Sequence, residues 1–368
     1  MQTGSGSVSV AANRQRFGAA LLALALTALS GTAQAQGKAQ ARAQGEVQGQ
    51  GQASSDAAGI RIVDFDWIDA ARGRAVPARL HWPVDIGASA RVPLIVFSHG
   101  MGGSRRGYSY LARAFAARGV ASLHVQHVGS DRSVWAGNPF ALVQRLQTAA
   151  QESEALARGK DIRFALDRVL SQEAGPYAAR IDRRRIVAAG HSYGANTALV
   201  AVGAGVMRDG RRLEAKDPRF SAAILISSPP FYGEKQLAPV LENVSVPTLH
   251  VTATGDVIQI PGYYSPAADR LAIYNAIAAP RKAIAVFQGG SHSMFTDRAG
   301  TGGIELNPMV KAATAELALA FLGAVYDGDR ASMSRWNDKW KPILALAPGV
   351  SPLAGPVARA GAVSSQAR

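Results

Sequence analysis

Short apolar runs alternate with amphipathic segments through most of the chain. Residues 60–69 and 75–83 alternate apolar and polar positions, which is typical of antiparallel strands with one face in solvent. Six later runs are apolar throughout, as expected of parallel strands covered by helices on both faces. These runs are residues 92–97, 121–127, 184–190, 222–228, 247–254 and 282–288.

The segments between the apolar runs have helical periodicity. In residues 104–119 apolar side chains recur at helical spacing, with Ser104 as the expected cap and Gly119 as the expected stop. The pattern predicts an α/β fold with a mostly parallel central sheet, antiparallel N-terminal strands and helices on both faces, whose functional groups gather at the carboxyl ends of the strands. Further helices are expected over residues 140–159, 161–170 and 307–326.

The N-terminal residues have the pattern of an export signal. Arg14 and Arg16 precede a short apolar stretch, and Ala33 and Ala35 supply small residues for a signal peptidase, so residues 1–35 are expected to be removed. A single membrane anchor is the alternative, but the apolar stretch is short for a span. We expect an exported protein, periplasmic or extracellular, without an integral membrane segment in its mature form.

Two low-complexity stretches bound the expected catalytic domain. Residues 36–59 are rich in Gln, Ala and Gly and contain few large apolar side chains, so we interpret them as a disordered linker. Residues 348–368 have the same character and are expected to form a flexible tail. The domain is therefore expected to span residues 60–347.

Composition narrows the classes of function. The chain contains no cysteine, which excludes disulfides, thiolate metal sites and lipid attachment through an N-terminal cysteine. The formal net charge is +14, but the arginines are scattered rather than interleaved with aromatic residues. A solvated basic surface is therefore expected in place of a nucleic-acid site.

The stretch "GHSYGA" places Ser192 between a predicted strand and a helix of small residues. This is the context of a nucleophile elbow, in which the serine backbone is strained and the residues two before and two after it must be small. Gly190 and Gly194 meet that requirement. The alternative is that Ser192 only caps the helix.

A serine nucleophile needs a base from another loop, and His292 is the expected one. It follows a predicted strand through two glycines, late in the chain. His99, His124 and His250 lie in or at the end of apolar runs and are interpreted as core histidines. His191 neighbours the serine, but the geometry of the turn directs its side chain elsewhere.

The base in turn needs an acid, which in this fold lies between the serine and the histidine in chain order. Asp256 follows a predicted strand and satisfies that order. Asp269 and Asp297 are rivals, but the first lies in a predicted helix and the second follows His292. Asp256 is therefore preferred.

The loop "SHGMGG" ends the first of the apolar runs and can supply backbone N–H groups to a developing oxyanion. The amides of Met101 and Tyr193 form the expected pair. The alternative, a glycine-rich phosphate loop, lacks the lysine and the acidic partner that such loops use.

With these motifs in place, the chain resembles the serine-dependent α/β-hydrolases, in particular the bacterial group related to dienelactone hydrolases, platelet-activating-factor acetylhydrolases and cutinase-like polyester hydrolases. The stretches "PLIVFSHGMGGSRRGYSYLARAFAARG" and "GHSYGAN" carry the likeness, which extends over about residues 60–326. The resemblance implies a carboxylic ester hydrolase that works through an acyl-enzyme, with Ser192, Asp256 and His292 in the matching positions.

This chain departs from parts of that group. Dienelactone hydrolases use cysteine as nucleophile, so their substrate is not carried over. The acetylhydrolases place their acid after the strand that follows the nucleophile, where this chain has Ser227 and Ser228. Asp256, one strand later, looks more like the cutinase arrangement.

Aromatic residues in the loops over this sheet edge can line a substrate pocket. They can equally pack a lid formed by residues 128–160. The strongest pocket candidates are Trp135, Phe231 and Tyr232, with Phe140, Tyr263 and Tyr264 as further candidates.

We expect an exported serine esterase for a small-molecule or polymeric ester, requiring no metal and no cofactor. Within the enzyme class, a polyester hydrolase and a phospholipid acetyl-ester hydrolase are the variants. From another class, a catalytically silent binding protein with this fold is the competing hypothesis, which an intact set of Ser192, Asp256 and His292 disfavours.

Overall fold

The computed structural model describes residues 52–56, 59–87, 89–260 and 262–348. These residues belong to one compact unit, Gly49–Arg368. The expected signal peptide, most of the expected linker and nearly all of the expected tail lie outside the described residues.

A central sheet of ten strands organises the described residues, in the order β1-β2-β3-β5-β4-β6-β9-β10-β13-β14. The strands from β5 to β13 in this order are parallel, while β1, β2, β3 and β14 pair antiparallel. The predicted α/β fold with antiparallel N-terminal strands is confirmed. The bounds are β1 Gln52–Asp56, β2 Ile60–Asp69, β3 Arg74–Pro83, β4 Val92–Ser98, β5 Ala121–Val125, β6 Ile181–His191, β9 Ala222–Ile226, β10 Thr248–Ala253, β13 Lys282–Phe287 and β14 Leu344–Leu346.

The sheet starts before the expected domain boundary at Ile60. Strand β1 lies within the segment that composition suggests is a linker, yet it pairs with β2 from Gln52 opposite Asp64 to Asp56 opposite Ile60. Backbone hydrogen bonds to a free strand edge do not require apolar side chains, which explains why composition alone does not reveal this strand.

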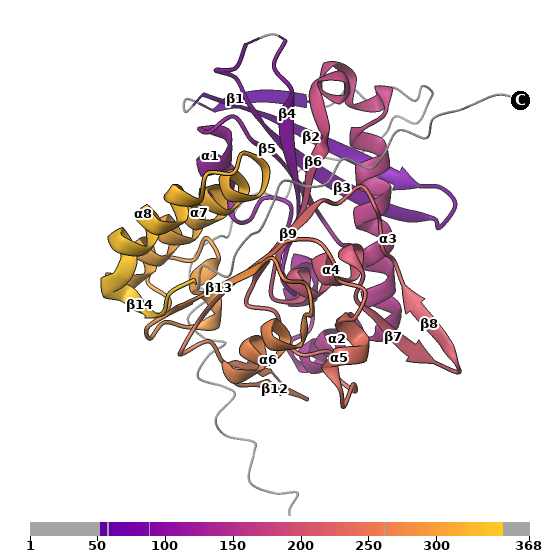
Figure 1. Ribbon diagram of the computed structural model, residues 1–368. Helices are drawn as coiled ribbons and strands as arrows, with labels where there is room; N and C mark the ends of the chain where they lie inside the picture. The colour runs from indigo at the N-terminus through magenta and orange to yellow at the C-terminus, as the bar shows by residue number, and fades with distance from the viewer. Residues whose placement is uncertain (1–51, 57–58, 88, 261, 349–368) are drawn as a thin grey trace, which may run out of the picture. The chain divides into compact units, whose positions relative to one another are not determined.

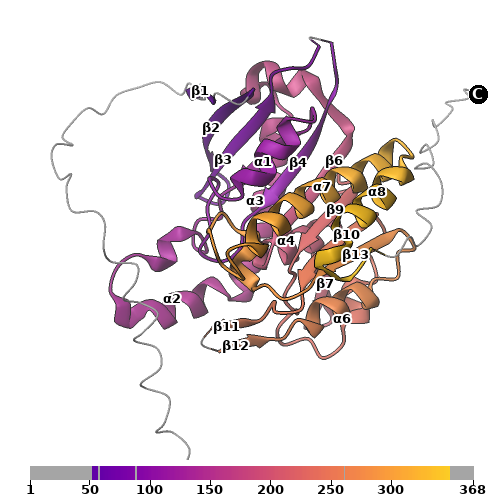
Figure 2. The same ribbon diagram turned by 90° about the vertical axis from the view of Figure 1, so that its left-hand side faces the viewer.

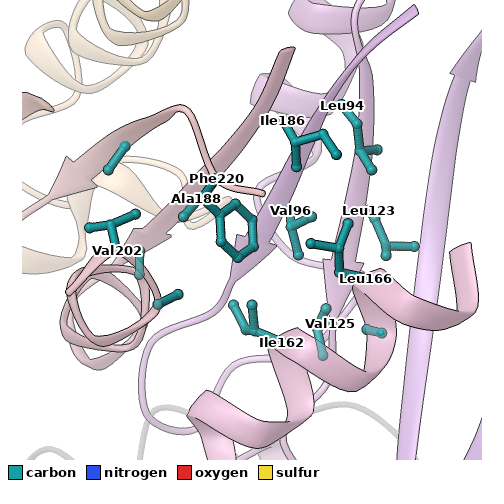
Figure 3. Packing of buried hydrophobic residues seen from close by; sticks show 14 of the residues in the cluster. Leu94, Val96, Leu123, Val125, Ile162, Leu166, Ile186, Ala188, Val202 and Phe220 are labelled. Atoms are coloured by element: carbon teal, nitrogen blue, oxygen red, sulfur yellow. The ribbon is translucent and has the colours of Figure 1, made fainter. Parts of the chain in front are cut away.

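Alternation along the central strands divides the core into two layers. In β4, Leu94 and Val96 face one layer, whereas Ile95 and Phe97 face the other. Figure 3 shows the first layer, where Ile162 and Leu166 of α3 (Glu152–Val169) face the strands. Both faces of the sheet are therefore buried, as continuous apolar runs require.

Helices cover both of these faces (Figure 1). One layer receives α3, α4, α5 and α6, and the other receives α1, α7 and α8. The remaining bounds are α1 Ser109–Ala116, α2 Leu142–Ala149, α4 Tyr193–Val202, α5 Leu237–Leu241, α6 Ala268–Ala276, α7 Leu306–Tyr326 and α8 Arg330–Trp340.

Three expected helices differ from the structure in their bounds, and the one expected over residues 161–170 is the C-terminal part of α3. Helix α1 begins at Ser109, after Tyr108 with φ 60°, so Ser104 is not its cap; the Ser104 carbonyl instead accepts a turn hydrogen bond from Gly107 N–H at 3.1 Å. The expected helix over residues 140–159 is two helices, because the chain turns at Gln151, where ψ is 153°, before α3 begins.

Helix α7 is long and apolar enough to cross a membrane, with a mean hydropathy of 1.4. Its apolar side chains, including Val310, Leu317 and Phe321, are buried against the sheet. Packing in the protein core therefore accounts for its composition.

Smaller elements extend from the carboxyl ends of the strands, among them α2 and a hairpin of β11 and β12 (Figure 2). The α2 segment has its own small core, in which Val134, Leu146 and Ala149 pack with Met101. Two hairpins form sheets separate from the central one: β7 Gly205–Arg208 with β8 Arg211–Glu214, and β11 Ile258–Ile260 with β12 Tyr263–Ser265.

Candidate active site

Ser192 lies in the tight turn between β6 and α4. Its φ of 55° and ψ of −126° place it in a conformation that non-glycine residues rarely adopt, as the elbow pattern predicts. Its N–H donates to the carbonyl of Ile226 at 2.9 Å, which ties the turn to the end of β9.

The two glycines around Ser192 are sterically required. A Cβ at Gly190 would lie 2.2 Å from the carbonyl oxygen of Gly194, and a Cβ at Gly194 would lie 1.9 Å from the carbonyl oxygen of Ser98. Strand β6 and helix α4 can approach this closely only without side chains at these positions. The spacing of small residues in the sequence thus has a direct steric cause.

Consecutive hydrogen bonds link Ser192, His292 and Asp256. His292 begins a 3₁₀ turn after β13, and its Nε2 lies 2.8 Å from Ser192 Oγ. Its Nδ1 lies 2.7 Å from Asp256 Oδ1. These hydrogen bonds join three loops at the carboxyl ends of β6, β10 and β13. Asp269 accepts instead from Ser265, and Asp297 from the N–H of Ser109.

Asp256 is held as a carboxylate. Burial alone would raise its pKa, but the hydrogen bond from His292 and the positive charge of Arg270 outweigh burial, and the net effect lowers the pKa of Asp256. The Thr252 hydroxyl donates to its second oxygen at 2.7 Å. An ionised acid accepts the Nδ1–H of His292, which leaves Nε2 free to accept a proton.

Ser227 is a fourth member of this cluster that the sequence alone does not identify. Its Oγ lies 2.8 Å from Nδ1 of His292, and its backbone has φ 54°. It directly follows β9, where the resemblance to the acetylhydrolases would place the acid. The place of Ser227 directly after a strand is the feature of the sequence that could have identified it as a member of the cluster. Asp256 is the carboxylate of the cluster, and Ser227 lies beside it.

The two amides expected to form an oxyanion hole point to no acceptor. Neither Met101 N–H nor Tyr193 N–H donates a hydrogen bond to another of the described residues. In the same loop, Gly102 N–H donates to Ser130 at 2.9 Å and Gly103 N–H donates to Gly100 at 3.0 Å. These bonds fix the loop while its Met101 amide stays available.

Hydrogen bonds of His191 link the loop that contains Gly100 to the loop that contains His292. Gly100 N–H donates to the Tyr108 hydroxyl at 3.1 Å, and that hydroxyl lies 2.9 Å from Nδ1 of His191. Nε2 of His191 donates to the carbonyl of His292 at 3.1 Å. Burial lowers the pKa of His191 to about 3, so the ring is neutral and can both donate and accept. As expected, its side chain points away from Ser192.

A second Ser-His-Asp series lies beneath residues 99–103, the loop that contains the Met101 amide and that we call the oxyanion loop. Ser98 Oγ is 2.9 Å from Nε2 of His127, whose Nδ1 is 3.1 Å from Asp161 Oδ2. All three side chains are buried, and burial lowers the pKa of His127 to about 4. Since no substrate reaches Ser98, this series supports the structure rather than acting as a nucleophile system.

Arg158 of α3 hydrogen-bonds both to that buried series and to the oxyanion loop. Its guanidinium donates to Ser98 Oγ at 3.0 Å and to the carbonyl of His99, and it is fully buried. Nη1 of the same guanidinium donates a hydrogen bond to Ser130 Oγ at 2.8 Å. Nothing in the charged helical stretch around Arg158 indicates burial, so its position follows only from the tertiary structure. His99, His124 and His250 are buried, in agreement with their interpretation as core histidines.

A cavity of about 200 Å³ opens beside Ser192. Phe231, Tyr232 and Tyr263 line it, as expected of pocket residues. Trp135 does not line it, contrary to expectation: its indole N–H donates to the carbonyl of Gly102 at 3.0 Å, which holds the ring over the oxyanion loop. Phe140 and Tyr264 also lie outside the lining, and Phe140 is 96% exposed.

The arrangement suits nucleophilic acyl transfer. It combines a hydroxyl bonded to a base, a carboxylate bonded to that base, and two free amides next to a mostly apolar cavity. Over the described part of the chain, no group of three or more metal-ligating side chains converges.

Comparisons with known proteins give one family and several solved structures. Residues 74–297 match the profile of a family described as platelet-activating factor acetylhydrolase, isoform II. A PEG-bound cold-adapted esterase from an Arctic intertidal metagenomic library aligns with a TM-score of 0.48 and 15% identity, covering 72% of this chain and 99% of that chain. A native structure with the same description aligns with a TM-score of 0.44 and 16% identity, covering 71% and 96%. No curated protein sequence matches.

Proposed function

The chain belongs to the platelet-activating factor acetylhydrolase isoform II family, and from this premise we propose that it is an exported serine esterase in which Ser192, His292 and Asp256 form the catalytic triad. The fold is that of an α/β-hydrolase, and the family hydrolyses carboxylic esters. The observation that carries the proposed triad is the continuous hydrogen bonding from Ser192 Oγ through His292 to Asp256.

In the proposed mechanism, His292 Nε2 removes the proton from Ser192 Oγ as the oxygen attacks the ester carbonyl carbon. The carbonyl oxygen becomes negative and accepts hydrogen bonds from the amides of Met101 and Tyr193. The tetrahedral intermediate collapses as the protonated His292 gives its proton to the departing alcohol. An acyl-enzyme on Ser192 is left.

Water then completes the reaction by the same steps in reverse. His292 takes a proton from the water, whose oxygen attacks the acyl carbon, and the proton passes to Ser192 Oγ as the acid departs. Asp256 holds the Nδ1–H and stabilises the positive charge on His292 during both halves. No metal or cofactor has a part in these steps.

The mostly apolar lining of the cavity supports an aliphatic or aromatic ester as substrate. Among the variants, a small or medium acyl ester fits a cavity of about 200 Å³ better than a polymer, which needs an open groove. Export is proposed from the residues of the signal pattern, and a mature N-terminus at Gln36 is its expected result.

Hydrolysis of p-nitrophenyl esters from acetate to palmitate tests the proposal. The mature chain should turn over at least one of these esters, and Ser192→Ala should be inactive while keeping its fold. Ser221→Ala is the matched control, because this serine lies near the start of β9 and bonds to Tyr326 at 2.6 Å. Undiminished activity in Ser192→Ala would overturn the proposed nucleophile.

Covalent labelling separates the enzyme from a silent binding protein. A fluorophosphonate probe should modify Ser192 in the wild-type chain and fail to label Ser192→Ala. Absence of both turnover and labelling would favour the binding protein. For export, N-terminal sequencing of protein from the periplasm or medium should begin at Gln36, whereas an intact N-terminus in the membrane fraction would indicate an anchor.

A further inference from the structure

The lining of the cavity beside Ser192 includes the residues expected to bind the oxyanion but not His292. Met101 and Tyr193, whose amides face the oxyanion, line it together with Ser192, whereas His292 does not. The departing alcohol must receive its proton from His292, so it must lie on the His292 side. The cavity is left for the other half of the ester, which is the acyl group.

The cavity follows one face of α4. Ser192, Asn196 and Val200 are four residues apart and all contribute to its wall. At 1.5 Å per residue, the wall from Ser192 to Val200 is roughly 12 Å long. An acetyl group, with a single methyl beyond its carbonyl, would occupy only the first part of such a space.

The walls beyond Ser192 are mostly apolar. Leu156 of α3, Val206 of β7 and Leu213 of β8 face the cavity with Val200. Such walls favour methylene groups over charged or hydroxylated acyl groups. Side chains from α3, α4 and the β7–β8 hairpin thus define an apolar acyl path.

Three charged side chains stand at the end of this path. Arg208, the last residue of β7, lies 2.6 Å from Glu152 and 2.6 Å from Glu234. All three line the cavity, and each comes from a different segment: the hairpin, the first turn of α3 and the loop after β9. We call this set the Arg208 bridge. Because Arg208 is 37% exposed, the bridge lies between the cavity and solvent.

We propose that the cavity is an acyl pocket for straight aliphatic chains of medium length, and that the Arg208 bridge closes its far end and sets the longest chain accepted. This inference rests on the proposed function. A longer chain would have to bury its terminal methylenes against paired charges or separate Arg208 from its carboxylates, and both are unfavourable.

The test compares chain-length profiles of kcat/KM for p-nitrophenyl esters from acetate to palmitate. Wild-type protein should prefer a medium chain over both acetate and palmitate. Arg208→Ala should raise the ratio for long over medium chains by on the order of tenfold, since each methylene that gains an apolar contact contributes roughly threefold to fourfold. Arg212→Ala is the matched control, because Arg212 lies on the same hairpin and pairs with Glu242 at 2.8 Å without lining the cavity.

A second variant acts in the opposite direction. Val200→Phe places a larger side chain in the wall of the path, so it should lower activity on medium chains relative to acetate by about tenfold or more. It also tests the pocket independently of whether Arg208→Ala folds.

The outcomes distinguish the two proposals. If the wild-type chain is inactive on every ester, the proposed function is overturned, and the assignment of the cavity as an acyl pocket is overturned with it. An active wild type whose profile is unchanged in both Arg208→Ala and Val200→Phe, as in Arg212→Ala, overturns the acyl pocket alone. Opposite shifts in the two variants support it.

Discussion

The guanidinium of Arg158 lies over the ring of Tyr193, with its central carbon 4.3 Å from the ring centroid. The same guanidinium donates to the carbonyl of His99, two residues before Met101. One buried cation thus contacts both segments whose amides are proposed to bind the oxyanion. Burial lowers the pKa of Arg158 to about 10, so it remains charged at neutral pH.

Arg158 is therefore expected to position the oxyanion hole. Arg158→Met should reduce kcat by on the order of tenfold to a hundredfold, with a much smaller change in KM, because the oxyanion forms only in the transition state. Arg158→Lys, which keeps the charge but not the planar donors, should recover part of kcat.

Steady-state kinetics and thermal unfolding of both variants check this prediction. Loss of the guanidinium also leaves Ser98 and Ser130 without a donor, so a lower Tm is expected in Arg158→Met. A kcat that follows Tm alone, with no recovery in a stable Arg158→Lys, would point to a purely structural role.

Gly194→Ala should disrupt the contact between α4 and the oxyanion loop. The added Cβ would lie 1.9 Å from the carbonyl oxygen of Ser98, which belongs to the backbone and cannot rotate away. A loss of about 3 kcal/mol in the free energy of unfolding is expected, at the upper end of the range for overpacking. Gly87→Ala is the control, since a Cβ there meets nothing within 4 Å. Urea denaturation of the two variants measures the difference, and equal stabilities would contradict the steric account.

The features that the sequence predicts well are those with a local cause. Buried parallel strands need apolar residues at every position, so their runs are visible without a structure. The elbow around Ser192 needs small residues at fixed offsets, and these are visible for the same reason. His292 and Asp256 stand at strand ends, so the order of the strands brings them near Ser192.

The features that the sequence does not reveal depend on contacts distant along the chain. Arg158 lies in a helix whose charged residues resemble a solvated face, and only the packing of α3 against the oxyanion loop shows its burial. Trp135 was expected in the pocket because it is aromatic and lies in a loop, but its hydrogen bond to Gly102 directs it elsewhere. Nothing local to the β7–β8 hairpin predicts that Arg208 reaches two carboxylates on other segments.

Buried neutral histidines should make the protein sensitive to mild acid. Burial lowers the pKa of six of the seven histidines; it is about 4 for His81 and about 3 for His250. In the unfolded chain the histidine pKa is about 6.5, so between about pH 6.5 and 4 the unfolded state binds more protons than the folded state. The free energy of unfolding must therefore fall as pH is lowered through this window, by up to about 1.4 kcal/mol per pH unit for each histidine.

Thermal unfolding between about pH 8 and 4.5 measures this effect, with Tm expected to decline from near pH 6.5. The lowered pKa values of Asp161 and Asp256 cannot cause an early decline, because the stability they contribute is lost only below the ordinary carboxyl pKa, near pH 4. His81→Gln removes one titrating group and should reduce the slope. A constant Tm down to about pH 5 would refute the prediction.

The position of Ser227 suggests that the acid of the proposed triad can be moved. Asp256→Asn should lower kcat by about a thousandfold to ten-thousandfold, because an amide cannot hold the required tautomer of His292. Ser227 Oγ already lies 2.8 Å from Nδ1 of His292, and an aspartate tolerates the positive φ of 54° better than most residues. The double variant Asp256→Asn with Ser227→Asp should therefore regain at least about tenfold in kcat over Asp256→Asn.

Two controls isolate the relocated carboxylate. Asp256→Asn with Ser227→Ala should show no recovery, since it offers no charge to Nδ1. Ser227→Asp alone places a second carboxylate beside the imidazole, which favours the protonated ring, so its kcat should reach its full value only at a higher pH than in the wild type. Equal kcat in Asp256→Asn and in both of its double variants would mean that the end of β9 cannot present a carboxylate to His292. In that case the one-strand shift of the acid to Asp256 is fixed by the backbone of this chain rather than by the choice of side chain at position 227.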